Sequence, residues 1–254
     1  MATIAKPLPE VGGRVSRVRR IGFAAVVALV GLFIGFMMFS IPALIMGWFI
    51  GGSGQIHRVH EIGWGAFGGI LISTAMFLQL WKPERKVALL QQVGLSVIAF
   101  AVAMTLVGAF EPTVLAVLAL VGVAGLLHPA RGELLRFEAR ISPILAGITA
   151  LAAIPLVVYA SDMVKIERAV VSSDPHEGHW TGMAALAIAL ILVGGLTALR
   201  TTGYRITARI VGAAALVLGV ASVVFPDYAS SLGGMWGSVA IFGGIAFIAA
   251  AEWE

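Results

Sequence analysis

The chain has 254 residues, of which 59% are hydrophobic and only 12% are charged. Because water-soluble globular domains carry about twice that charged fraction, the composition indicates an integral membrane protein with membrane lipid as its partner. The formal charge of +4 does not indicate a nucleic-acid partner, since an excess of Lys and Arg in a membrane protein usually orients its helices. The absence of cysteine excludes disulfides, thiolate metal sites and cysteine nucleophiles.

Residues 1–20 form a polar, basic segment ahead of the first apolar run. That run is longer than the h-region of a signal peptide, and no small-residue cleavage site follows it. We therefore expect a retained cytoplasmic tail.

Charged clusters divide the rest of the chain into eight apolar runs, and about 20 apolar residues span a bilayer. The predicted helices are Ile21–Ile50, Ile62–Trp81, Val87–Phe110, Val114–Leu127, Ile141–Asp162, Thr181–Leu199, Ile206–Phe225 and Leu232–Ala251. The first run is too long for a straight span, and we expect Pro42 to kink it or to end its regular part. We expect the short fourth run to extend through His128. The predicted fold is an all-α, polytopic transmembrane bundle of eight helices.

The basic residues predict the orientation of this bundle, because Lys and Arg are retained on the cytoplasmic side. With the N-terminus inside, fourteen of the seventeen basic residues fall in cytoplasmic segments, and only Arg58, Lys165 and Arg168 fall outside. This asymmetry favours an even number of spans with both termini in the cytoplasm. We expect a bacterial or archaeal plasma membrane.

Tryptophans and glycines have expected structural roles in such a bundle. Four tryptophans are predicted to lie near the outer interface as part of an aromatic belt: Trp48, Trp64, Trp180 and Trp236. Four glycines of the second span are predicted to let a neighbouring helix approach closely: Gly63, Gly65, Gly68 and Gly69.

Two short stretches share the pattern His-Glu-x-x-Trp, HEIGW at 60–64 and HEGHW at 176–180, which are 116 residues apart. The same offset brings Lys82 within two residues of Arg200, each at the end of a predicted span. These matches predict a tandem repeat.

The predicted repeat has two four-helix units, at 21–130 and 131–254, after the tail at 1–20. Pro42 and Pro155 lie in the outer halves of the first spans of these units. Since four is an even number of spans, the two units are expected to be parallel and related by an axis along the membrane normal. The two His-Glu-x-x-Trp stretches would then face each other at the outer end.

Three of the five histidines of the chain lie in these two stretches, and a fourth, His57, lies three residues before the first of them. Residues three and four apart lie on one face of a helix, and imidazole and carboxylate groups suit transition metals, while paired imidazoles can also bind haem iron. The candidate ligands of a metal or haem site are His57, His60, Glu61, His176, Glu177 and His179. Three methionines predicted at the same level would favour copper if they lay close: Met46, Met163 and Met235.

Other interpretations of the same residues stay open at this point. Acidic residues are favoured at helix N-termini, and Asp174 is a possible N-cap, so the cluster is equally well read as structural. A pH-responsive or substrate-contacting site is a third possibility. We expect His128, which precedes Pro129, to be a helix C-terminal residue and not a ligand.

The chain resembles the haem A synthase family in its eight spans, built as two four-helix halves with histidines at their outer ends. His57–Arg58 followed by Gly63 is similar to that family's His-Arg element. The chain departs from the family because its eighth span has no histidine and His128 lies at the opposite end of the fourth span. No residue role is carried over from the family, and we assign the chain to none.

Three function classes remain. The first is a membrane redox or metal protein that binds a metal ion or a haem at its outer face. The second is an uncoupled transporter or channel for a small solute, since the spans lack the charged mid-span residue that coupled carriers usually show. The third is a non-catalytic subunit that packs against other membrane subunits. Whether the protein is an enzyme is left open by the sequence.

Overall fold

The computed structural model describes residues 16–49, 58–109, 111–136, 141–169 and 178–254. These residues form helices and no strand, which confirms the all-α prediction. The elements are α1 (Arg17–Leu32), η1 (Phe33–Met37), α2 (Ser40–Phe49), α3 (Arg58–Trp64), η3 (Gly65–Thr74), α4 (Ala75–Leu78), η4 (Pro83–Arg85), α5 (Val87–Val107), α6 (Pro112–Leu127), η5 (Arg131–Glu133), α7 (Pro143–Ala169), α8 (His179–Ala198), α9 (Tyr204–Val224) and α10 (Gly233–Trp253). Here η1 and η3 are π-helical, and η4 and η5 are short 3₁₀ turns.

The elements combine into eight helical segments, because α1, η1 and α2 follow one another in the first and α3, η3 and α4 in the second. Seven of them are long and apolar enough to cross a membrane, and α6, with 16 residues, is shorter. The predicted extension of the fourth helix through His128 is wrong, because His128 leaves the helical conformation as the C-cap of α6. The fifth helix runs beyond its predicted end at Asp162, up to Ala169.

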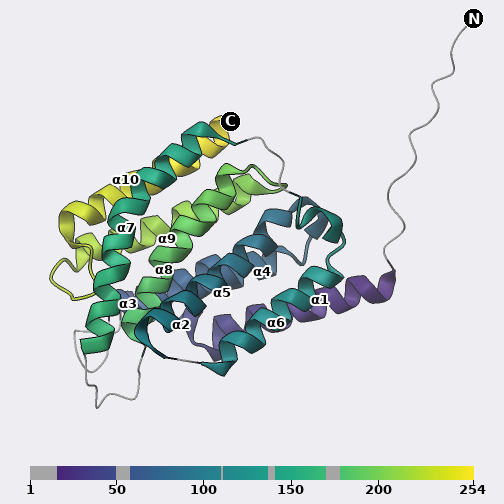
Figure 1. Ribbon diagram of the computed structural model, residues 1–254, viewed down its shortest axis with the longest axis horizontal. Helices are drawn as coiled ribbons and strands as arrows, with labels where there is room; N and C mark the ends of the chain where they lie inside the picture. The colour runs from purple at the N-terminus through teal and green to yellow at the C-terminus, as the bar shows by residue number, and fades with distance from the viewer. Residues whose placement is uncertain (1–15, 50–57, 110, 137–140, 170–177) are drawn as a thin grey trace, which may run out of the picture.

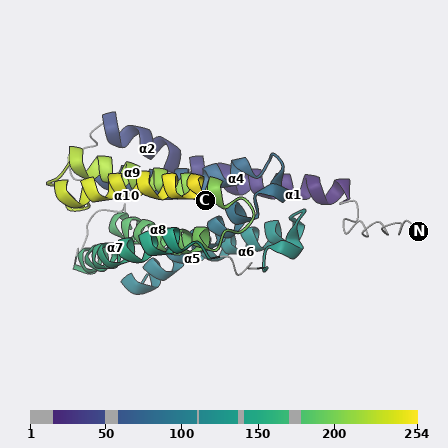
Figure 2. The ribbon, with the colours of Figure 1, turned by 90° about the horizontal axis from the view of Figure 1, so that it is seen from above.

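The helices pack in two layers (Figures 1 and 2). One layer contains α1, α2, α4, α9 and α10, and the other contains α5, α6, α7 and α8. Each layer therefore takes helices from both predicted four-helix units. Among the spans, α8 is the most deeply buried, and α7 is the least. Up to Val158, the large side chains that α7 exposes are apolar, as a lipid-facing helix requires: Ile144, Leu151, Ile154, Val157 and Val158.

Glycines bring several of these helices into backbone contact. A Cβ placed on Gly244 of α10 would lie 2.7 Å from the carbonyl oxygen of Gly212 of α9, and one on Gly219 would lie 2.7 Å from that of Gly237. In lipid, where helices gain little from the hydrophobic effect, such close approach is a main source of helix association. The sequence had singled out the second span for this role, and there the prediction is confirmed. A Cβ on Gly65 would lie 2.5 Å from the Cα of Leu44.

The first segment is broken in its second half, between Met38 and Ser40. The helix changes to π-helical form at Phe33, and Phe39 has a positive φ of 58° before α2 begins at Ser40. Pro42 explains the break, since it has no N–H to donate to the carbonyl of Met38 and its ring would clash with that carbonyl in a continuous helix. Pro155 lies inside the continuous helix α7, so the two predicted repeat units differ at this point. The tandem repeat stays a prediction.

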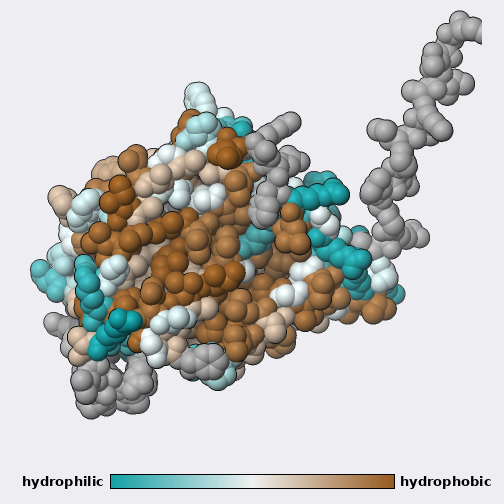
Figure 3. All heavy atoms as spheres, in the orientation of Figure 1, coloured by the Kyte–Doolittle hydropathy of each residue, from teal (hydrophilic) through white to brown (hydrophobic). Residues whose placement is uncertain are grey.

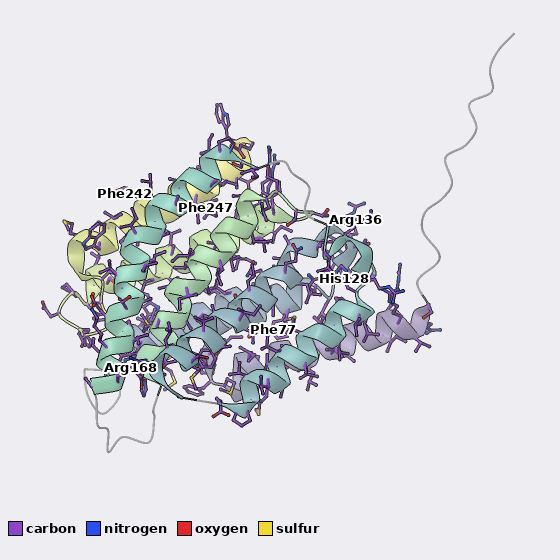
Figure 4. All side chains as sticks on the ribbon, viewed as in Figure 1. Phe77, His128, Arg136, Arg168, Phe242 and Phe247 are labelled. Carbon is purple, nitrogen blue, oxygen red and sulfur yellow. The ribbon has the colours of Figure 1, made fainter. Side chains whose placement is uncertain are left out.

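Hydrophilic residues gather at the two ends of the bundle, and an apolar surface lies between them (Figure 3). We call the end that carries His128 and Arg136 the basic end, and the end that carries His60, His179 and Arg168 the histidine end. Figure 4 shows Arg168 opposite to His128 and Arg136. The first helix, α1, begins at the basic end, where Arg19 donates to the carbonyl of Leu127. The last helix, α10, finishes at the same end, where Arg200 donates a hydrogen bond to the carbonyl of Glu254 at 2.8 Å.

At the basic end the turn before α5 packs against the turn before α9. The N–H of Ala88 donates to the carbonyl of Thr202 at 2.9 Å, and a Cβ on Gly203 would lie 2.8 Å from the Cα of Lys86. Lys86 is buried, and its ammonium group donates to the carbonyls of Leu78 and Trp81. Burial lowers the pKa of Lys86. Its role is to satisfy carbonyls at the end of the second helical segment.

Candidate functional site

Two histidines from helices far apart in the sequence meet at the histidine end. The ring centroids of His60 on α3 and His179 at the start of α8 lie 4.2 Å apart, with an interplanar angle of 52°. His60 is buried, with 2% of its surface exposed, and His179 is half-buried. Each histidine comes from one of the two His-Glu-x-x-Trp stretches, so the expectation that these stretches face each other is confirmed for this pair.

The contact between the two histidines depends on a close crossing of α3 and α8. A Cβ on Gly63 of α3 would lie 2.1 Å from the Sδ atom of Met183, and one on Gly182 of α8 would lie 3.2 Å from the indole of Trp64. Gly63 is one turn after His60, and Gly182 is one turn after His179. The small residues therefore set the distance between the helices at which the two imidazoles touch.

The start of α8 is held by a carboxylate from the end of α7. Glu167 accepts hydrogen bonds from the N–H of Gly178 at 3.2 Å and from the N–H of Thr181 at 2.9 Å. The N-cap position itself is Gly178, with a φ of 108° and no side chain to cap the helix. Glu167 thus takes the capping role that the sequence had suggested for Asp174, which lies outside the described residues. By fixing the first turn of α8, Glu167 positions His179.

Tryptophans surround the histidine pair. The ring of Trp180 lies 6.2 Å from that of His60 and 6.4 Å from that of His179, and both contacts are edge-to-face. Trp64 packs against Phe67 and Phe100 and donates its Nε1–H to the carbonyl of Met38 at 2.8 Å. Trp64 and Trp180 therefore pack inside the protein, whereas Trp236 is 46% exposed, as the predicted aromatic belt requires.

Of the other four predicted ligands, the structure describes one, Glu61. His57, His176 and Glu177 lie outside the described residues. Glu61 is half-buried and follows His60 on α3. Within the part of the chain that the structure describes, no three His, Asp or Glu side chains come together as a metal site would require.

The expectation that Met46, Met163 and Met235 lie close to the histidines stays a prediction, and Met46 is half-buried on α2. Met235 is 69% exposed on α10, and Met163 is buried within α7. Met183 is the methionine in the α3–α8 crossing, against Gly63. Neither Met183 nor Glu167 was singled out in the sequence, and the one signal that could have found Met183 is its i, i+4 relation to His179.

His128 lies at the basic end, far from this pair, and its expected role as a helix C-terminal residue is confirmed. It is fully buried, its ring packs edge-on against Phe23 at 5.2 Å, and its Nδ1 accepts the N–H of Ala130 at 3.1 Å. Arg19 donates to the carbonyls of Leu127 and His128, which satisfies the C-terminus of α6. Burial lowers the pKa of His128 to about 4, so the ring is neutral at pH 7.

Comparison of the chain with protein-family models, curated proteins and solved structures gives no match.

Proposed function

We propose that this integral membrane protein binds a transition-metal ion at the histidine end, with His60 and His179 as two of its ligands. The observation that carries the proposal is the 4.2 Å separation of the two imidazole rings, which come from two different spans and from two copies of one sequence pattern. Neutral imidazole is the commonest protein ligand of zinc and copper. We propose no reaction for this site.

The spacing of the rings supports a metal ion more than a haem. With metal–nitrogen bonds of about 2.0 Å, two imidazoles on one tetrahedral ion have ring centroids roughly 5 Å apart. Two imidazoles that bind one haem iron from opposite faces would have centroids roughly 6 Å apart, with the porphyrin between them. The observed 4.2 Å is closer to the first value, so a small separation of the rings would admit an ion.

The surroundings support the same assignment. The half-buried Glu61, next to His60 on α3, supplies a carboxylate that would either bind the ion or orient an imidazole through its second nitrogen. Arg58, the basic residue of α3, contacts the ring of Phe225 at 5.3 Å and donates a hydrogen bond to the carbonyl of Trp48. The predicted ligands His57, His176 and Glu177 belong to the same proposal.

By the distribution of Lys and Arg, the basic end lies in the cytoplasm of a bacterial or archaeal cell and the histidine end on the outer side of the plasma membrane. The metal would then be taken from the extracytoplasmic medium.

The test is calorimetric titration of the detergent-solubilised protein with Cu²⁺ and, separately, with Zn²⁺. We expect about one equivalent to bind, and H60A and H179A each to weaken binding by about 100-fold, since loss of a ligand exceeds the 10–100-fold effect of an outer-shell change. W180F is the matched control, because it keeps an aromatic ring against both histidines but removes no ligand. H57A and H176A report on the other predicted ligands.

Binding of equal strength in the wild type, H60A and H179A would overturn the proposal. So would weakening of the same size in W180F, since it would show that packing at the α3–α8 crossing, and not ligation, controls the metal affinity.

A further inference from the structure

Met183 lies one helical turn further into the bundle than the histidine pair. It follows His179 by four residues on α8, and Gly63 follows His60 by three residues on α3, so both lie about 5 Å further along their helices than the histidines. Met183 is fully buried. A Cβ on Gly63 would overlap the sulfur atom of Met183 and would lie 2.6 Å from its methyl carbon. The sulfur therefore rests on the backbone of α3, at a position where only glycine leaves room for it.

The geometry of α8 directs the side chain of Met183 toward the histidine pair. In an α-helix the Cα–Cβ bond tilts toward the N-terminus, and long side chains lie over the preceding turn. For Met183 the preceding turn carries His179, the first residue of α8. Because methionine is unbranched and flexible, its sulfur can reach an ion held between the two imidazoles without movement of the backbone.

The donor groups that meet at this crossing favour Cu(I) over a divalent ion. A thioether is a soft ligand, which selects Cu(I), whereas zinc is bound by thiolate, imidazole and carboxylate groups. The chain has no cysteine, so methionine is its only source of a sulfur ligand.

The charge of the donor groups leads to the same ion. Neutral imidazole and thioether bring no negative charge, and His60 and Met183 are both buried. A buried ion whose ligands are neutral keeps its full charge uncompensated, and the cost of removing an ion from water rises with its charge. A monovalent ion is therefore bound there at a lower desolvation cost than a divalent one.

We propose that the ion bound at the histidine end is Cu(I), and that the thioether of Met183 joins the imidazoles of His60 and His179 as a further protein ligand. This assignment rests on the proposed function, which it deepens by naming the ion and one more ligand. Gly63 contributes by leaving open the space from which the sulfur reaches the ion.

The first test is X-ray absorption at the copper edge, on the detergent-solubilised full-length protein loaded with Cu(I) under anaerobic conditions. Since the chain has no cysteine, any protein sulfur that binds the copper must belong to a methionine. We expect a sulfur neighbour beside nitrogen neighbours in the wild type, and loss of the sulfur neighbour in M183L. M76L is the matched control, because Met76 is also fully buried but lies on α4, toward the basic end. It should keep the sulfur neighbour.

The second test compares the affinity for Cu(I), measured by competition with bathocuproine disulfonate, with the affinity for Zn²⁺, measured by calorimetry. Leucine has nearly the volume of methionine but no sulfur, so the substitution preserves packing. M183L should weaken Cu(I) binding by about 10-fold or more, as the loss of a ligand does. It should change Zn²⁺ binding by less than about twofold, because zinc does not use a thioether. M76L should change neither affinity.

Copper without a sulfur neighbour in the wild type, or with the same sulfur neighbour in M183L, would overturn the assignment of Met183. Equal weakening of Cu(I) and Zn²⁺ binding in M183L would overturn it too, since Met183 would then act by packing at the α3–α8 crossing. The proposed function is tested separately by H60A and H179A. It stands if these two variants weaken Zn²⁺ binding, whatever the result for M183L, and it fails together with the present assignment if they do not.

Discussion

The indole of Trp64 replaces the hydrogen bond that Pro42 cannot make. In a continuous helix the carbonyl of Met38 would accept the N–H of residue 42, and proline has none. Trp64, from the second helical segment, donates to that carbonyl at 2.8 Å. Trp64 of the first His-Glu-x-x-Trp stretch therefore has a structural role at the break in the neighbouring helix, and this role requires no bound ligand.

This relationship predicts a coupling between the two positions. W64F should lower the free energy of unfolding by about 1 kcal/mol, because it leaves the part-buried carbonyl of Met38 without its donor. In the background of P42A, whose residue 42 has an N–H, the same substitution should cost less than half as much. Unfolding in mixed micelles with increasing dodecyl sulfate measures both values.

W236F is the control for loss of an indole, since Trp236 is 46% exposed, and it should change stability by less than about 0.5 kcal/mol. An equal cost of W64F with and without Pro42 would show that packing, and not the hydrogen bond, accounts for the effect.

The capping of α8 by Glu167 predicts an effect on the proposed metal site without any direct contact. E167A should lower stability by about 1 kcal/mol and weaken Cu²⁺ or Zn²⁺ binding by about 10-fold, because the first turn of α8 positions His179. Calorimetry and thermal unfolding check the two effects. D162N removes a charge near the same end of α7, in an exposed pair with Lys165, and should change neither. Metal binding of wild-type strength in E167A would show that the cap of α8 does not control the geometry of the metal site.

The contact of α9 and α10 predicts opposite results for two adjacent glycines. G244A should destabilise the protein by about 1–3 kcal/mol, because its Cβ would lie 2.7 Å from the carbonyl oxygen of Gly212. G243A, whose Cβ meets nothing within 4 Å, should be neutral or slightly stabilising, since alanine favours helix. Unfolding free energies of the two variants provide the comparison, and similar values would contradict the proposed packing.

The buried His128 predicts a pH dependence of stability. Its pKa of about 4 in the folded protein is below the ordinary value of 6.5, so the unfolded chain binds more protons between these values. The stabilisation is therefore complete above pH 6.5 and is lost as the pH falls toward 4, by up to roughly 3 kcal/mol.

Unfolding at pH 7.5 and pH 4.5 should show this loss in the wild type, and H128N, which keeps an acceptor for the N–H of Ala130, should show a smaller one. Arg19 and Glu84 also act on His128, but they remain in both proteins. Equal losses in the two proteins would assign the pH dependence to other groups.

The class of the protein and the positions of its helices follow from local signals in the amino-acid sequence. In a bilayer each span must satisfy its own backbone hydrogen bonds, so hydropathy and charged breaks locate the spans with little help from tertiary contacts. The predicted third, sixth, seventh and eighth helices start and end within a few residues of α5, α8, α9 and α10. The same local signals predicted the irregularity near Pro42.

Which residues from different helices come into contact depends on how the helices pack. The tandem offset pairs His60 with His176, but the structure brings His60 to His179, one turn further along, because the contact depends on the rotation and crossing of α3 and α8 at Gly63 and Gly182. The cap from Glu167, the hydrogen bond of Trp64 and the contact of Trp64 with Phe100 likewise join residues from separate helices. No local pattern records these contacts, since each depends on how two helices are placed relative to each other.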